Sequence, residues 1–170
     1  FYLLGRNIDR VLVGRLRDRR DFKKGRFTRK EAKSIFEITK KITKEIGQDF
    51  PVPACKSKGA FLNVSLGVGS LALYRAILLK VKEIDYSTEL ATDICWDSFE
   101  RSTRFYRFIV KVCFRDSQKK INMGMKMALK YPFSRPDYDW KIIPSKDALF
   151  VDFYTCPVHE YFKKFGDEEM

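Results

Sequence analysis

The sequence predicts an α+β fold that is predominantly helical, with about five helices and a small C-terminal antiparallel β-sheet. Three observations lead to this prediction. Apolar residues recur at helical spacing through most of residues 1–130. The period then changes to that of strands at about residues 140–155, where two apolar runs flank Ser145-Lys146-Asp147, a hairpin turn signal. Finally, 45% of the 170 residues are apolar, which is enough for a packed core.

The first two predicted helices lie in the N-terminal third. Apolar residues at helical spacing place the first helix over about residues 2–19. Thr28 and Glu31 form a capping-box pattern that opens the second helix. Its buried stripe is predicted to contain Ala32, Ile35, Ile38, Ile42 and Ile46. Gly47 and the prolines that follow it are expected to end this helix.

Three further helices are predicted in the middle of the chain. The third covers about residues 63–82, and the fourth begins near Ser87 and continues to about Arg115. The fifth covers about residues 117–130. Tyr131-Pro132 and Arg135-Pro136 follow it, and they stop the helix because the residue before a proline disfavours helical backbone angles.

Residues 138–170 are predicted to form a β-hairpin followed by a short helix. Strand-like runs cover residues 140–144 and 148–155. An isolated hairpin is only marginally stable in water, so further strands or a covering layer of helices are expected. The chain is therefore interpreted as a single domain over residues 1–170 that lacks its C-terminal part, with residues 1–130 as its helical region.

Charge and hydropathy limit the partners that the sequence favours. Residues 1–60 hold 17 Lys and Arg against 7 Asp and Glu. Acidic residues are interspersed among these basic ones, and no aromatic residues alternate with them as single-strand binding requires. Nucleic-acid binding through the basic helices is therefore the weaker alternative. No membrane segment is predicted, because the longest uncharged run, residues 59–74, is shorter than the ~20 residues needed to span a bilayer.

The cysteines indicate a cytoplasmic protein with reduced thiols. They lie far apart in the sequence without a Cys-x-x-Cys pair, at Cys55, Cys95, Cys113 and Cys156. Gly67-x-Gly69-x-x-Ala72 is a candidate phosphate loop, but no second parallel strand follows it. Close helix packing at these glycines is the favoured interpretation.

The strongest candidate chemistry lies at the predicted strand-to-helix junction, where Cys156 and His159 flank Pro157 and Val158. Proline favours the first helical position, which makes Cys156 or Thr155 the N-cap. A thiol near a helix N-terminus becomes a better nucleophile because its pKa is lowered. His159, the only histidine, is a candidate base or, with Cys156, a metal ligand. The alternative is a structural cysteine beside a surface histidine.

The C-terminal stretch resembles the L-2-amino-thiazoline-4-carboxylic acid hydrolase family. The match is carried by Tyr131-Pro132, Asp139-Trp140, residues 152–160 and the helix that leads to Phe165-Gly166. A weaker similarity lies at residues 73–76. Family members usually continue with a further Cys and Asp and another strand, whereas this sequence stops at Met170.

The resemblance implies a hydrolase that opens a small cyclic amidine, such as 2-aminothiazoline-4-carboxylate, to a carbamoyl-cysteine. Cys156 would attack the substrate or help to hold a divalent metal, and His159 would be the acid and base. Asp152, which would pair with the amidinium, and Tyr154 are the candidate substrate-binding residues. The alternative function is a non-catalytic small-ligand or regulatory module on the same fold. A homo-oligomer is compatible with either function.

Overall fold

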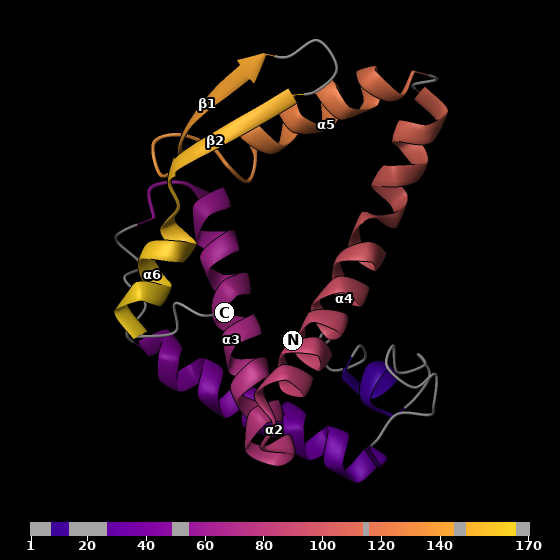
Figure 1. Ribbon diagram of the computed structural model, residues 1–170, viewed down its shortest axis with the longest axis vertical. Coiled ribbons are helices and arrows are strands. Elements are labelled where there is room, and N and C mark those ends of the chain that lie inside the picture. The colour runs from indigo at the N-terminus through magenta and orange to yellow at the C-terminus, as the bar shows by residue number, and fades with distance from the viewer. Residues whose placement is uncertain (1–7, 14–26, 49–54, 114–115, 145–148, 166–170) are drawn as a thin grey trace. The chain divides into compact units, whose positions relative to one another are not determined.

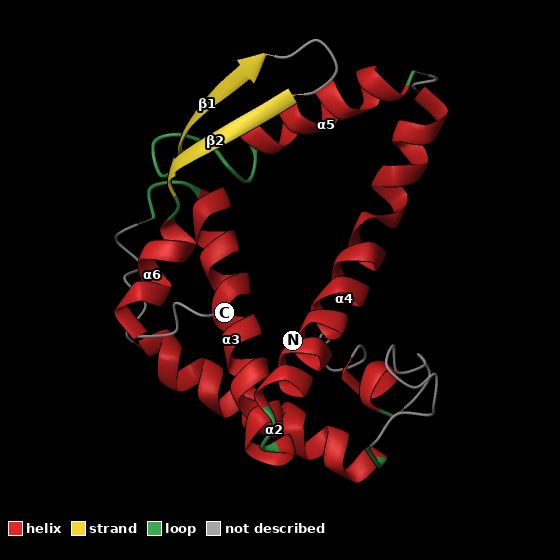
Figure 2. Ribbon diagram, viewed as in Figure 1, coloured by secondary structure: helices red, strands yellow, loops and turns green. Residues whose placement is uncertain are grey.

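The computed structural model describes residues 8–13, 27–48, 55–113, 116–144 and 149–165. The described chain is mostly helical, with one two-stranded antiparallel sheet near the C-terminus, which confirms the predicted α+β class (Figures 1 and 2). A short helical segment covers residues 8–12. The remaining elements are α2 (Arg29–Gln48), α3 (Lys58–Val81), α4 (Ile84–Cys113), α5 (Ser117–Lys130), β1 (Asp139–Pro144), β2 (Leu149–Thr155) and α6 (Pro157–Phe165).

The element boundaries follow the sequence closely where the signals are local. The bounds of α5 are those predicted, and β1 and β2 each differ from prediction by one residue at their first position. In contrast, α3 begins at Lys58, five residues before its predicted start. The predicted hairpin turn and most of the predicted first helix lie outside the described residues.

The chain divides into two compact units. The first unit comprises residues 1–49 and 68–105, and the second comprises residues 50–67 and 106–170. The boundary between the units falls inside α3 and again inside α4. The interpretation of residues 1–170 as one domain stays a prediction, and each unit is described separately below.

The first unit is organised around aliphatic side chains from several helices. The predicted capping box opens α2, because Thr28 N donates to Glu31 Oε2 at 2.7 Å and Glu31 N donates to Thr28 Oγ1 at 3.3 Å. Lys82 adopts a left-handed conformation with φ of 59° just after α3, as helix C-termini often do. The core cluster consists of Ile8, Val11, Leu12, Ala32, Ile35, Leu73, Ala76, Ile77, Tyr86, Leu90, Ala91 and Ile94.

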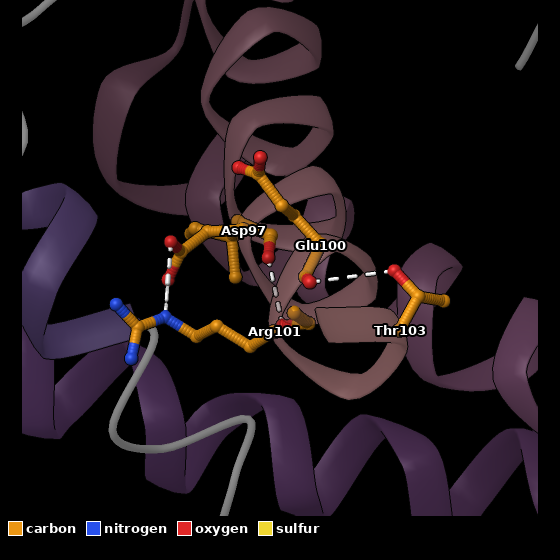
Figure 3. Close-up of polar contacts among 6 residues, drawn as sticks. Asp97, Glu100, Arg101 and Thr103 are labelled. Atoms are coloured by element: carbon orange, nitrogen blue, oxygen red, sulfur yellow. Dashed lines mark hydrogen bonds and ion pairs between the residues drawn. The ribbon is translucent and has the colours of Figure 1, made fainter. Parts of the chain in front are cut away.

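A charged pair lies on α4 within the same unit. Asp97 is buried, and its two carboxylate oxygens accept hydrogen bonds from Arg101 Nε at 3.0 and 3.1 Å (Figure 3). The two residues are four positions apart, so they lie on the same side of the helix. The pairing compensates the cost of burying the carboxylate.

The second unit contains the hairpin. Trp140 pairs with Phe153, and Lys141 pairs with Asp152, in an antiparallel register. Because alternate residues of a strand point to opposite faces, Trp140 and Phe153 share one face, and Lys141 and Asp152 share the other. The Phe153 ring lies 5.4 Å from the ring of Phe133, between centroids, so the first of these faces carries an aromatic cluster.

Candidate functional site

The N-terminus of α3 is capped by one neighbouring and one distant side chain. Ser57 occupies the N-cap position, where its Oγ accepts a hydrogen bond from Ala60 N at 3.1 Å. Asp137 Oδ1 and Oδ2 accept hydrogen bonds from Lys56 N and Ser57 N, each at 2.7 Å. Burial acts to raise the pKa of Asp137, but the hydrogen bonds from Lys56 and Ser57 outweigh it and lower that pKa. The segment around Asp137 is thereby fixed to the start of α3.

One face of α3 carries Gly59, Asn63 and Gly67, which are spaced four residues apart and therefore lie on the same side of the helix. A Cβ atom at Gly59 would lie 2.5 Å from the carbonyl oxygen of Pro132. A Cβ atom at Gly67 would lie 3.1 Å from Val158 Cγ1 on α6. The two glycines thus permit the close approach of the turn after α5 and of α6, which runs beside the N-terminal half of α3 (Figure 1).

Asn63, which lies between these two glycines in the sequence, forms a hydrogen bond with the buried Tyr138. Its Nδ2 donates a hydrogen bond to the hydroxyl oxygen of Tyr138 at 2.8 Å. Tyr138 is only 1% exposed, and its ring contacts Phe133 and Phe153 at centroid distances of 5.2 and 6.2 Å. The phenol is therefore fixed at both ends, by ring packing and by a hydrogen bond.

Burial disfavours ionisation of the Tyr138 phenol. Burial raises the pKa of Tyr138, and the hydrogen bond from Asn63 opposes this rise. A negative charge at Cys156, Cys55 or Asp137 would raise the pKa of Tyr138 further.

Cys156 lies at the junction between β2 and α6. It occupies the N-cap position because α6 begins at the next residue, and its carbonyl oxygen accepts a hydrogen bond from Glu160 N at 3.0 Å. The competing cap, Thr155, instead accepts a hydrogen bond at Oγ1 from Asp139 N at 2.6 Å. The Cys156 side chain is free and half-buried.

Cys55 is a second thiol of the site, and it directly precedes Lys56, whose amide is bound by Asp137. Burial raises the pKa of Cys55, and the negative charge of Asp137 raises it further. Its side chain is free and half-buried, like that of Cys156. Deprotonation of Cys55 is therefore disfavoured where it lies.

His159 belongs to the first turn of α6, and its side chain is exposed. In the described part of the chain, no hydrogen bond joins its ring to Cys156. The two residues predicted from their spacing therefore lie on the same turn, with the sulfur half-buried and the imidazole open to solvent. The predicted acid–base role of His159 stays a prediction.

Asp152 and Tyr154 are both exposed on β2. Phe153, which lies between them, is on the face that contacts Tyr138, so both neighbours point to the other face of the hairpin. The structure does not bring them together with Cys156. Their predicted contact with substrate stays a prediction.

No metal centre is evident in the residues that the structure describes. No group of three or more His, Cys, Asp or Glu side chains gathers there in a way that would hold a metal ion. Cys156 and His159, the predicted candidate ligands, gain no third ligand within this part of the chain. The predicted divalent metal stays an open alternative.

One described helix, α3, is long and apolar enough to cross a membrane. The core helices of soluble proteins have the same length and composition, and Leu71, Leu73 and Ile77 of α3 are fully buried in the first unit. This is weak evidence for a membrane segment. The predicted cytoplasmic location stays a prediction.

Comparisons with protein-family models, curated proteins and solved structures find no match to the chain. The resemblance to the thiazoline hydrolases therefore rests on the sequence motifs alone.

Sequence reasoning found Cys156 and His159, but it did not connect Asn63, Tyr138 or Cys55 with them. One signal was present in the four-residue spacing of Gly59, Asn63 and Gly67. The candidate phosphate loop overlapped this pattern, but α3 continues through Gly67 without a loop. The favoured interpretation, close helix packing at these glycines, is confirmed at Gly67 but is wrong at Gly69, where an added Cβ atom would have nothing within 4 Å.

Proposed function

We propose that this protein is a hydrolase that opens a small cyclic amidine, such as 2-aminothiazoline-4-carboxylate, to a carbamoyl-cysteine. Cys156 is the proposed nucleophile. One observation carries the assignment: the Cys156 thiol is half-buried at the N-cap of α6, where a helix N-terminus favours a negatively charged nucleophile. The family resemblance of residues 152–160 supplies the substrate class.

The first half of the reaction breaks the thiazoline ring. The Cys156 thiolate attacks the amidine carbon, and the bond from that carbon to the ring sulfur breaks. The ring sulfur leaves as the thiol of the cysteine moiety after it takes up a proton. The amidine carbon is then held on the enzyme as an isothiourea. The N-terminus of a helix favours a nearby negative charge, and Cys156 lies at the N-cap of α6.

The second half of the reaction releases the product. Water attacks the isothiourea carbon, and the bond from that carbon to the Cys156 sulfur breaks. The urea group of carbamoyl-cysteine forms, so the net change is the addition of one water molecule. His159 is the proposed group that takes the proton from water, since its imidazole ring is exposed to solvent on the first turn of α6, three residues after Cys156.

The test is turnover of L-2-aminothiazoline-4-carboxylate by the purified chain. Product is followed by mass spectrometry as a gain of one water, and the new thiol is followed with a disulfide reagent after protein removal. Cys156→Ser is expected to lower kcat by about a thousandfold or more, because a hydroxyl at this position is a much poorer nucleophile. Cys95→Ser is the matched control, since Cys95 lies in the first unit against Ser70 and should leave turnover unchanged.

Two results would contradict the proposal. Equal turnover by Cys156→Ser and the unsubstituted chain would remove Cys156 from the reaction. Saturable binding of the substrate in calorimetry without any turnover would favour the non-catalytic ligand-binding module.

A further inference from the structure

We propose that the outer face of α5 is a docking surface for an amphipathic helix of another protein, one whose apolar side chains are flanked by acidic residues. The inference goes beyond the proposed function and does not depend on it, since α5 contains none of the proposed catalytic residues. Three properties of α5 carry it: a ridge of exposed apolar side chains, an open row of small residues beside that ridge, and charges of one sign only.

Only one side of α5 is covered by the rest of the chain. Leu129 is buried, and Asn122 and Met125, which lie on the same side of the helix, are half-buried. Two methionines on the opposite side, Met123 and Met127, are 41% and 42% exposed. Single exposed apolar side chains are common on protein surfaces, whereas a continuous patch of them marks a site of interaction.

The exposed apolar residues form a continuous ridge along the helix. Met123, Met127 and Tyr131 are spaced four residues apart, so they follow one another along one side of α5. Tyr131 comes directly after α5, and its amide still donates a hydrogen bond to Met127 O at 2.9 Å, so the helical turn continues through it. Tyr131 is 55% exposed. Methionine side chains adapt to the shape of a partner because they are unbranched and flexible.

A row of small residues lies beside this methionine ridge. Gly124 and Ala128 each follow a methionine of the ridge by one position. A Cβ atom added at Gly124 would have nothing within 4 Å, so the space above it is open. Ile121, on the far side of the row, is 56% exposed. The row is therefore a shallow groove between two apolar borders, and helices pack by placing a ridge of one into such a groove of the other.

The charged side chains of α5 are all lysines. The helix contains Lys119, Lys120, Lys126 and Lys130 and no aspartate or glutamate. Lys119, Lys126 and Lys130 are exposed, and they lie on the side of the methionine ridge that faces away from the groove. In the described part of the chain, none of the four lysines forms an ion pair. Their charge favours a partner with acidic residues at the matching positions.

This combination of charge and shape distinguishes between the possible occupants of the groove. A second copy of the chain would bring together two helices that each carry four lysines and no acidic residue, which charge repulsion opposes. The phosphates of a nucleic acid would contact the lysines but leave the methionine ridge unused. A bilayer would take up the apolar side chains but has no ridge to place in the groove. An acidic amphipathic helix uses all three properties.

The size of the surface predicts a weak and reversible interaction. α5 contains 14 residues and is about 21 Å long. One helix face of this length buries less surface than the interfaces of stable complexes do. The affinity is expected to be in the micromolar range and to fall as salt is added, because exposed charges are screened.

The test uses a synthetic peptide of about 20 residues, which is long enough to form a helix. Leucines at helical spacing form its apolar stripe, and glutamates flank them. In a second peptide, lysines replace the glutamates. Fluorescence anisotropy measures the binding of each labelled peptide to the purified chain at low salt. The acidic peptide is expected to bind with saturation, and the lysine peptide should bind about tenfold more weakly or less.

Gly124→Leu tests the groove. A Cβ atom at this position meets nothing within 4 Å, so the fold accommodates the substitution, but the leucine fills the groove. Binding of the acidic peptide should weaken about tenfold or more. Gly47→Leu is the matched control, because a Cβ atom at Gly47 on α2 also has nothing within 4 Å, and it should leave binding unchanged. Circular dichroism checks that both variants are as helical as the unsubstituted chain.

A double substitution, Lys126→Glu with Lys130→Glu, tests the charge. It should weaken binding of the acidic peptide about tenfold or more, because acidic side chains would then face each other. Lys30→Glu with Lys33→Glu is the matched control, since these exposed lysines on α2 give the same change in net charge. The control should weaken binding no more than about twofold.

Three results would overturn the inference. They are no binding of the acidic peptide to the unsubstituted chain, equal affinity for the lysine peptide, and unchanged binding after Gly124→Leu. Phosphatidylserine vesicles and duplex DNA are measured in parallel. Vesicle binding that Gly124→Leu strengthens, without peptide binding, would assign the face to a membrane, because added apolar area favours lipid binding. DNA binding that only the lysine substitutions weaken would assign it to nucleic acid. No substrate enters these measurements, so the proposed hydrolase is tested separately.

Discussion

The two units of this protein are stabilised in different ways. In the first unit, fully buried aliphatic side chains from α2, α3 and α4 form a cluster in which most members have no polar group to satisfy. In the second unit, fewer side chains are buried among the described residues, and two of them are the tyrosines Tyr138 and Tyr161. There, hydrogen bonds between distant parts of the sequence fix the segments that surround the candidate site.

The aliphatic core of the first unit and the hydrogen-bonded segments of the second unit contribute differently to stability and to chemistry. An aliphatic core contributes through buried area and offers no reactive group. A polar arrangement contributes less free energy per contact, but it fixes hydroxyl, amide and thiol groups in defined positions. The first unit is therefore suited to stabilising the fold, and the second is suited to holding a reactive site.

The largest expected change in the free energy of unfolding comes from a substitution in the first unit. Leu73→Ala removes a side chain that is 0% exposed, and it should lower the free energy of unfolding by about 2–5 kcal/mol because a cavity remains. Leu79→Ala on the same helix is the control, since Leu79 is 63% exposed and its loss should cost no more than about 0.5 kcal/mol. Chemical denaturation measures both values. Similar losses in the two variants would contradict the aliphatic description of this core.

An intermediate effect is expected where α3 enters the second unit. Gly59→Ala would place a Cβ 2.5 Å from the carbonyl oxygen of Pro132, so the backbone must shift, at a cost of about 1–3 kcal/mol. Gly69→Ala has nothing within 4 Å and should stabilise α3 by up to about 1 kcal/mol, because alanine has the higher helix propensity. Opposite signs of the change in melting temperature are expected. The same sign for both would refute the close packing at Gly59.

The smallest expected effect is a change in how the stability of the fold depends on pH. Because the pKa of Asp137 is lowered on folding, its contribution is present above its ordinary pKa of 3.8 and is lost as pH falls through the folded value. Asp137→Asn should therefore be less stable than the unsubstituted chain at pH 7, by about 1 kcal/mol, and the difference should vanish in acid. Denaturation at several pH values measures this difference.

A second carboxylate serves as the comparison for Asp137. Glu31 caps α2 in the first unit, and hydrogen bonds from Thr28 lower its pKa in the same direction. Glu31 is exposed, so Glu31→Gln should give a smaller difference with the same sign of pH dependence. A stability difference for Asp137→Asn that persists unchanged at low pH would show that its charge plays no part.

The sequence predicted those features of the fold that depend on neighbouring residues. The capping box at Thr28 and the bounds of α5 follow from local patterns, and the structure confirms both. The start of α3 was placed five residues late because part of its cap comes from Asp137, 80 residues away from Ser57. A helix end that is stabilised from a distance leaves no local signal of that stabilisation.

The same limit applies to the candidate site. Cys156 and His159 were found because they are close in sequence, beside a proline that begins a helix. The hydrogen bond between Asn63 and Tyr138 joins residues 75 positions apart, and no spacing rule connects them. The role of each site residue stays a prediction until the turnover experiments are done.

The distant cap of α3 also has a consequence for how the chain folds. Asp137 closes a loop of about 80 residues when it binds the amides of Lys56 and Ser57. Closing a loop of this length loses conformational entropy before the contacts that offset this loss have formed. Such non-local contacts therefore slow folding. During synthesis on the ribosome, the first turn of α3 would emerge long before its partner. Local helices such as α2 can therefore form early, whereas the surroundings of Cys156 become ordered late.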